Sequence, residues 1–120
     1  MESLVQQFNE CINSRDLTGL AALISENHSF IDTTDQQVEG KEAVLKAWQS
    51  FFSYFPDYRN IFESVVVADG IVSIAGTSKC SDAELEGPTL WCAKITNNEI
   101  SEWRIYEDNA ANREALNLNN

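Results

Sequence analysis

The first half of the chain carries apolar residues at the three- and four-residue spacing of helices. The first helical face consists of Leu4, Val5, Phe8, Cys11 and Ile12. Residues 13–16 interrupt it, and Asp16 can cap a second short helix. The apolar residues of that helix are Leu17, Leu20, Leu23 and Ile24. A third helix is predicted from Gly40 to Phe55, because Pro56 disfavours helical geometry in the residue before it.

Strand-forming residues follow. A short strand over residues 27–34 precedes the third helix and runs into a turn at 35–37. Four further strands are predicted over residues 59–67, 71–79, 89–96 and 100–107. Asp69-Gly70 and Asn97-Asn98 predict tight turns, and residues 81–88 form an acidic loop. From Asp108 the chain is polar and predicts a frayed helix with Leu116 and Leu118 as weak anchors.

Helices followed by a strand meander predict an α+β fold, with helices on one side of a curved antiparallel sheet. We expect one domain over residues 1–120, because no linker or repeat interrupts the chain. Apolar residues occur on both faces of some strands, as at residues 65–67. Something must cover the second face, so we expect a homodimer with sheets packed back to back.

The charge of the chain limits the classes of molecule that it is expected to bind. Its formal net charge is −11, and such a field repels phosphate backbones and anionic lipid surfaces. We therefore expect neither a nucleic-acid nor a membrane partner. The three cysteines, Cys11, Cys80 and Cys92, are widely spaced and form no C-x-x-C motif. This pattern, together with a polar start that lacks the features of a signal peptide, predicts a cytoplasmic protein.

Four stretches give the chain a family resemblance. They are Asn13–Leu20, Phe30–Asp32 followed by Gly40–Ala43, Phe55–Arg59, and Glu99–Asp108. In the order and spacing of these four stretches, the chain resembles the nuclear-transport-factor-2-like superfamily. Within that superfamily it resembles the SnoaL-like and ketosteroid-isomerase-like proteins. The resemblance implies a cone-shaped fold that encloses an apolar pocket. It implies less about activity, since this fold hosts isomerases, cyclases, dehydratases, hydrolases and binding domains.

The resemblance makes Asp32 the first catalytic candidate, because the isomerases place a proton-abstracting carboxylate at the end of this strand. A carboxylate in an apolar pocket has a raised pKa, which suits a general base. The alternative is that Asp32 caps the turn through Thr33 and Thr34. The chain departs from the isomerases at Phe8, where they carry a tyrosine, and near Trp91, which replaces their second donor. Steroid isomerisation by their mechanism is therefore not expected.

Polyketide cyclases of the SnoaL-like group place an acid–base carboxylate shortly after a tryptophan that corresponds to Trp103. Glu107 shares a strand face with Trp103, while Asp108 matches the spacing equally well, so both are catalytic candidates. The histidine usual in that group after the second long strand is absent; Ser78 and Ser81 lie nearby. The alternative for both acids is a solvated strand end.

Aromatic residues are the candidates for ligand contact. The predicted pocket residues are Phe8, His28, Phe30, Trp48, Phe52, Phe55, Tyr58, Trp91 and Trp103. Each could instead belong to the core, but a conical fold cannot fill its mouth from its own side chains alone. His28, the only histidine, could be a proton shuttle or a structural residue. A single histidine and the absence of H-E-x-x-H predict no metal site.

These observations lead to two principal hypotheses. In the first, the protein is an isomerase, cyclase or lyase that acts on a small apolar or aromatic carbonyl compound. Asp32 is then the base, Glu107 or Asp108 is the acid, and no cofactor is needed because the chemistry is proton transfer. In the second, the protein is a non-catalytic ligand-binding or protein-interaction domain, as the lack of charge-stabilising donors indicates. A third idea is that dimerisation itself is the function.

Overall fold

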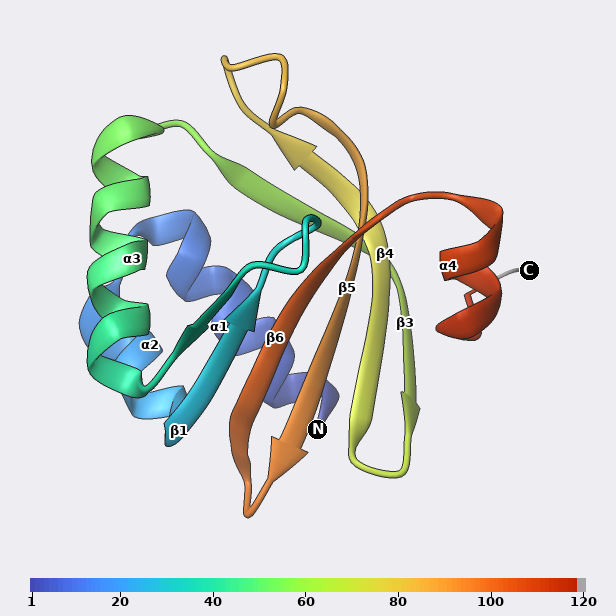
Figure 1. Ribbon diagram of the computed structural model, residues 1–120, viewed down its shortest axis with the longest axis horizontal. Coiled ribbons are helices and arrows are strands. Elements are labelled where there is room, and N and C mark those ends of the chain that lie inside the picture. The colour runs from blue at the N-terminus through green and yellow to red at the C-terminus, as the bar shows by residue number, and fades with distance from the viewer. Residues whose placement is uncertain (119–120) are drawn as a thin grey trace.

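The computed structural model describes residues 1–118 and contains four helices and six strands in that range. Their order along the chain is α1 (Glu2–Ser14), α2 (Leu17–Leu23), β1 (Ile24–Ile31), β2 (Gln37–Glu39), α3 (Lys41–Tyr54), β3 (Arg59–Ala68), β4 (Ile71–Lys79), β5 (Gly87–Thr96), β6 (Glu99–Glu107) and α4 (Ala110–Ala115). Helices α1, α2 and α3 lie on one side of the sheet, and α4 lies at the far end of the molecule (Figure 1).

Local signals explain where the helices begin and end. Helix α1 ends at Arg15, which adopts the left-handed conformation with φ 59°. Asp16 caps α2 as predicted, because its Oδ1 accepts a hydrogen bond of 2.9 Å from the Gly19 amide. Helix α3 follows Gly40, whose φ of 93° favours glycine, and gives way at Phe55 before the proline. All three helices predicted in the first half of the chain are present, and α4 is the helix predicted after Asp108.

The six strands form one mixed sheet in the order β2-β1-β6-β5-β4-β3. Strand β1 pairs parallel with β6 through Phe30 and Trp103, while every other pairing among the described residues is antiparallel. The α+β class is confirmed, but the parallel pair departs from the predicted all-antiparallel sheet. Strand β2 was not predicted, and β1 begins at Ile24, which the helical spacing had assigned to the second helix.

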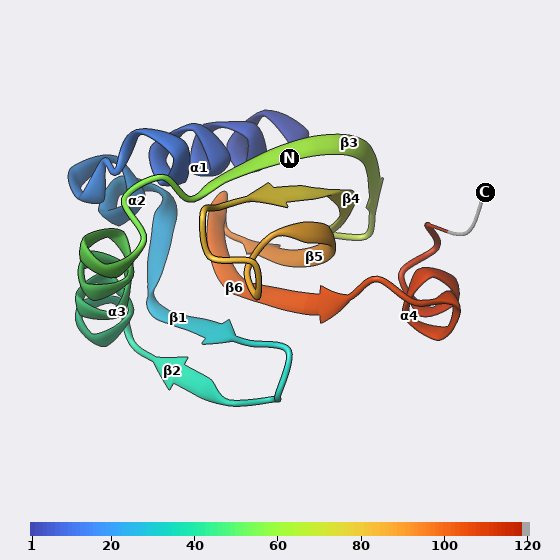
Figure 2. The same ribbon diagram turned by 90° about the horizontal axis from the view of Figure 1, so that it is seen from above.

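Register shifts bend this sheet. The pairing of β3 with β4 shifts between Phe62 and Ser64, opposite Gly76 and Ala75, and the pairing of β5 with β6 shifts between Lys94 and Ile95. Such bulges increase the local bend and twist of a strand. Seen from above, β3 runs beside α1 and bends at its far end, while β2 and α3 lie on the other side (Figure 2). The helices and the bent strands therefore surround an interior hollow that side chains can fill.

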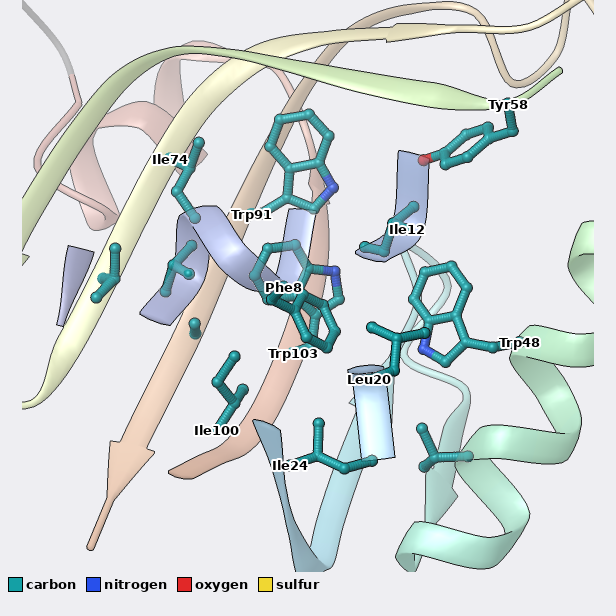
Figure 3. Close-up of a cluster of buried hydrophobic side chains, with 14 of the residues drawn as sticks. Phe8, Ile12, Leu20, Ile24, Trp48, Tyr58, Ile74, Trp91, Ile100 and Trp103 are labelled. Carbon is teal, nitrogen blue, oxygen red and sulfur yellow. The ribbon is translucent and has the colours of Figure 1, made fainter. Parts of the chain in front are cut away.

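Aromatic side chains fill the deepest part of that hollow (Figure 3). The ring centroids of Phe8 and Trp103 are 4.6 Å apart, and those of Phe62 and Trp91 are 5.2 Å apart. Phe8, Trp91 and Trp103 are fully buried. Helix α1 supplies Phe8, and the sheet supplies the other three rings. This stack therefore fixes the helix on the sheet.

The second face of the sheet is partly covered from within the chain. Leu118, which follows α4, is buried against Ala75 and Leu90. The Arg113 guanidinium binds both carboxylate oxygens of Asp108, at 2.5 and 2.8 Å, which holds the helix in place. The predicted anchors are thus confirmed, and Leu118 is the stronger of the two. Pairing of two chains through the rest of this face stays a prediction.

No helix within residues 1–118 is long and apolar enough to cross a membrane.

Candidate functional site

An apolar pocket of about 170 Å³ lies between α3 and the strands β1, β2 and β6. Its wall consists of Phe30, Val38, Val44, Ala47, Trp48, Phe51, Tyr58 and Ile105. Phe30 and Phe51 both contact the Trp48 ring edge to face, with centroids 5.5 and 5.8 Å from it. An engineered apolar cavity of about 150 Å³ in another protein stays dry and binds benzene. This pocket therefore has room for one aromatic ring or a branched alkyl group.

A larger cleft of about 540 Å³ adjoins the pocket and shares Phe30, Phe51, Tyr58 and Ile105 with it. Its remaining wall comes from the end of β1, the end of β6 and the loop between β4 and β5. Polar and acidic side chains predominate there. The two spaces meet along these four shared residues, so a ligand in the pocket can present a polar group to the cleft.

The turn before β3 positions the β4–β5 loop, which forms part of the wall of this cleft. The Asp57 carboxylate accepts a hydrogen bond of 2.9 Å from the Ser81 amide and contacts the Cys80 thiol at 3.5 Å. Hydrogen bonding from Ser81 lowers the pKa of Asp57, so this carboxylate stays charged. The Phe55-Pro56-Asp57 motif therefore holds the start of the loop that carries Glu84 and Glu86.

A hydroxyl network lies at the base of the cleft. The Tyr58 hydroxyl lies 3.3 Å from Ser78 Oγ, which donates to Asn60 Oδ1 at 2.9 Å and lies 3.2 Å from Thr89 Oγ1. Asn13 holds Asn60 by bonding both its amide and its carbonyl. Burial raises the pKa of Tyr58, so its hydroxyl remains a neutral donor. Of these residues, Tyr58 was a predicted pocket residue, and Ser78 was noted only for its position in the sequence. Asn60 and Thr89 stand in strands without any motif that marks them.

Asp32 lines the cleft, but its surroundings differ from those predicted. Its Oδ1 accepts hydrogen bonds from the Thr34 amide at 2.8 Å, the Thr34 hydroxyl at 2.7 Å and the Gln36 amide at 3.1 Å. The Thr34 hydroxyl bond is the main reason why the pKa of Asp32 is lowered. The predicted raised pKa is therefore wrong, because the turn rather than an apolar pocket surrounds this carboxylate. No hydrogen bond within the described chain reaches its second oxygen, Oδ2.

The two candidate acids after Trp103 are separated by the structure. Glu107 is exposed and lines the cleft. Asp108 instead binds Arg113, and this hydrogen bonding lowers the pKa of Asp108. Asp108 does not line the cleft, because its carboxylate closes the connection from β6 to α4. Only Glu107 is therefore placed to meet a ligand.

Most of the predicted ligand-contacting aromatics lie in the core. Phe30, Trp48 and Tyr58 line the pocket, whereas Phe8, His28, Phe52, Trp91 and Trp103 are buried outside both spaces. Phe55 is half-buried against Phe51, with ring centroids 5.0 Å apart. The aromatic stack fills the interior between α1 and the sheet, whereas the apolar pocket lies beside α3. Phe51, which was not among the predicted contacts, is an additional aromatic residue of the pocket.

His28 is a structural residue in this arrangement. Its Nδ1 lies 2.7 Å from the Ile100 carbonyl oxygen and donates to it, which joins β1 to β6. Its Nε2 is buried without a hydrogen-bond partner in the described chain, and burial lowers the pKa of His28. The ring is therefore held neutral and away from the cleft.

This burial predicts a loss of stability on acidification. The folded chain resists protonation of His28, whereas the unfolded chain takes up the proton below a pKa of about 6.5. The free energy of unfolding should thus fall by up to about 1.4 kcal/mol per pH unit as the pH drops below that value. Chemical denaturation of wild type and His28→Phe between pH 7 and 5 measures the effect. The variant should lack this slope, and equal slopes in both proteins would show that another group titrates. Asp32, Asp57 and Asp108 have lowered pKa values, so their contributions disappear only below this range.

No group of three or more histidine, cysteine, aspartate or glutamate side chains in residues 1–118 is arranged to hold a metal ion.

Comparison with known proteins adds family and fold to this geometry. A family model described as the SnoaL-like domain matches residues 5–110. A proposed polyketide cyclase from Sinorhizobium meliloti has a structure similar to this chain, with a TM-score of 0.79, 13% identity and coverage of 86% of this chain and 93% of that one. IdmH, a proposed polyketide cyclase from Streptomyces antibioticus, has a TM-score of 0.76, 17% identity and coverage of 89% and 91%. A proposed ketosteroid isomerase from Kribbella flavida has a TM-score of 0.74, 15% identity and coverage of 95% and 84%.

These structural matches confirm the predicted cone-shaped, NTF2-like fold. No curated protein matches the sequence.

Proposed function

Because the chain belongs to the SnoaL-like domain family, we propose that it binds a small, largely apolar carbonyl compound and rearranges it by proton transfer. The activity is that of an isomerase, cyclase or lyase that needs no cofactor. Two of the similar structures are named as polyketide cyclases and one as a ketosteroid isomerase, which supports this class of reaction. Three free thiols support a cytoplasmic location.

One observation carries the proposal: the apolar pocket and the wider cleft share four lining residues, and Tyr58 is the one of these four that carries a hydroxyl group. We place the apolar group of the ligand in the pocket between Phe30 and Phe51, and its carbonyl near the Tyr58 hydroxyl. Tyr58 can donate a hydrogen bond to the carbonyl oxygen, because burial keeps the phenol protonated. Ser78 donates its single hydrogen to Asn60, so Tyr58 exchanges its hydrogen bond to Ser78 for the one to the ligand, while Asn60 keeps Ser78 in place. This donor stabilises the negative charge that develops when a neighbouring proton is removed.

The carboxylates at the end of β1 and the end of β6 then move the proton. Oδ2 of Asp32 takes a proton from the carbon next to the carbonyl, and the C–H electrons pass to the oxygen as an enolate. Returning the proton to a different carbon completes an isomerisation, while attack of the enolate carbon on a second carbonyl closes a ring. Glu107, at the end of the neighbouring strand β6, is the second proton-transfer group. No oxidant or reductant is consumed.

A second candidate function is ligand binding without chemistry. The observation in its favour is the lowered pKa of Asp32, because a carboxylate of low pKa is a weak base. Tyr58 is also a single donor, where proton-abstracting enzymes commonly use two. The same pocket and the same ligand class serve both functions, so the difference lies in Asp32.

Exchange of carbon-bound protons distinguishes the two functions without a known substrate. We expect the protein to bind phenylacetone and 2-tetralone, with shifts of the Trp48 indole signal, and to accelerate deuterium exchange next to their carbonyls. Asp32→Asn should lower the exchange rate by at least about a hundredfold while leaving the affinity unchanged. The asparagine keeps the Oδ1 acceptor that the turn requires, so the variant removes the base without removing the turn.

Two further variants test the roles separately. Thr34→Ala removes the hydroxyl bond that lowers the pKa of Asp32, so the acid limb of the pH–rate profile should move to higher pH. Tyr58→Phe should lower the exchange rate and leave the pH profile in place. Binding of both ketones without exchange above the Asp32→Asn level would establish the second function. If neither ketone shifts the Trp48 signal, the pocket is not the ligand site and both functions are wrong.

A further inference from the structure

The cleft beside the apolar pocket has an uneven distribution of charge. Four carboxylates line it: Asp32 from the end of β1, Glu84 and Glu86 from the β4–β5 loop, and Glu107 from the end of β6. No lysine, arginine or histidine lines it. The negative charge is thus contributed by three separate segments that converge on one opening.

These carboxylates have no partners of opposite charge. The ion pairs of the described chain use Glu26, Glu42, Glu102, Asp35 and Asp108, each with its own lysine or arginine. None of the four carboxylates of the cleft forms an ion pair within residues 1–118. The net charge of −11 adds to the field rather than cancelling it. The charge at this opening is therefore available to act on whatever enters.

A concave surface strengthens such a field. Clefts lined by charge of one sign and bounded by apolar walls focus field lines, which attract one sign of ligand and repel the other. Here the apolar wall is the pocket itself, with Phe51 and Tyr58 at the junction. Aromatic faces add attraction for a cation and none for an anion. The pocket determines where the apolar end of a ligand lies, and the carboxylates determine the charge of its other end.

We infer that the natural ligand is a small apolar amine, with one ring or branched alkyl group in the pocket and a protonated nitrogen among the carboxylates of the cleft. Carboxylates, phosphate esters and acyl groups on anionic carriers are rejected. This inference rests on the proposed function, since it assumes that the pocket binds a ligand. It adds the sign of the ligand charge to the carbonyl compound proposed above, which then becomes an amine-bearing one.

Three probes of the same size test the charge. Phenethylamine, 2-phenylethanol and phenylacetate share one ring and two carbons but are cationic, neutral and anionic at pH 7. We expect phenethylamine to bind about tenfold more tightly than the alcohol at low ionic strength, and phenylacetate to bind too weakly to measure. The preference should shrink at about 0.5 M salt, because added ions screen exposed charges. Shifts of the Trp48 indole signal during NMR titration report the affinities.

Two matched variants distinguish the effect of the cleft carboxylates on ligand preference from the effect of the net charge of the chain. Glu84→Gln/Glu86→Gln removes two exposed charges from the cleft, and Glu2→Gln/Glu114→Gln removes two exposed charges elsewhere. The first variant should reduce the preference for the amine to about threefold and leave the alcohol affinity unchanged. The second should retain the wild-type preference.

The outcomes distinguish this inference from the function on which it rests. Binding of the alcohol with equal or weaker binding of the amine would overturn the inference and leave the proposed function intact. Equal effects of the two double variants would also overturn it, because the preference would then come from net charge alone. If none of the three probes binds, both the inference and the proposed function are wrong.

Discussion

Replacing Trp103 by alanine should lower the free energy of unfolding by about 3–5 kcal/mol, which is among the largest effects of a single core substitution. Trp103 is fully buried, and its ring contacts Phe8 with a centroid distance of 4.6 Å and Phe62 with one of 6.3 Å. Truncation leaves a cavity where α1 meets the sheet. Most domains have only about 5–15 kcal/mol of stability, so this loss is a large fraction of the total. Urea denaturation followed by circular dichroism measures it.

A solvent-exposed aromatic residue provides the matched control. Tyr54 is 78% exposed at the end of α3, so Tyr54→Ala should change the free energy of unfolding by less than about 0.5 kcal/mol. If Trp103→Ala does not fold, Trp103→Phe keeps a ring in the stack and should cost about 1–2 kcal/mol. Similar losses in Tyr54→Ala and a Trp103 variant would mean that the aromatic stack does not fix α1 on the sheet.

Replacing Gly76 by alanine should cost about 3 kcal/mol, although the same change in most strands is favourable. A Cβ at this position would lie 2.1 Å from the Ile61 carbonyl oxygen and 3.1 Å from Phe62 Cα. Removing a strand glycine ordinarily adds about 0.5–1 kcal/mol of stability. The clash outweighs this gain, because a backbone oxygen cannot rotate away as a side chain can. The bulge in β3 must move, and Phe62 must move with it.

The control for this prediction is a glycine with space around it. No atom lies within 4 Å of a Cβ built on Gly40, whose φ of 93° alone disfavours alanine. With ψ 140° its conformation lies close to a region that is essentially confined to glycine, so Gly40→Ala should cost about 1–3 kcal/mol through backbone strain without any clash, and thermal or urea denaturation gives the loss in each variant. A Gly76→Ala variant as stable as wild type would show that the two strands can separate freely at the bulge.

The fold was largely predictable because most of its signals are local. The spacing of Leu4, Val5, Phe8 and Ile12 is that of a helix, and the tight turn at Asp69-Gly70 has positive φ values of 53° and 77° at its two residues. Strand β2 was missed, because its three residues include a single apolar one, Val38. The parallel pairing of β1 with β6 was missed because it depends on contacts between distant segments.

The candidate site was only partly predictable. Periodicity placed Phe8 on an apolar helix face, and Trp91 and Trp103 were aromatic candidates, but neither signal tells which part of the interior is filled and which part is hollow. Phe30, Trp48 and Tyr58 line the pocket because they surround the space between α3 and the strands β1, β2 and β6. The environment of Asp32 depends on the hydrogen bonds that it accepts from Thr34 and Gln36 in the turn. A turn-capping role for Asp32 was the alternative to a catalytic base in an apolar pocket. Glu107 and Asp108 were distinguishable only once Arg113 was placed.

The parallel pairing has a consequence for how the chain is made. His28 in β1 and its partner Ile100 in β6 are 72 positions apart, and these two strands lie side by side in the sheet. Closing so long a loop is slow, because its entropy is lost before the contacts form. During synthesis, the edge of β1 that pairs with β6 and the side of Phe8 that packs on Trp103 therefore stay uncovered until β6 has been made. This interval, rather than the folded state, is when the protein is most prone to aggregate and most in need of a chaperone.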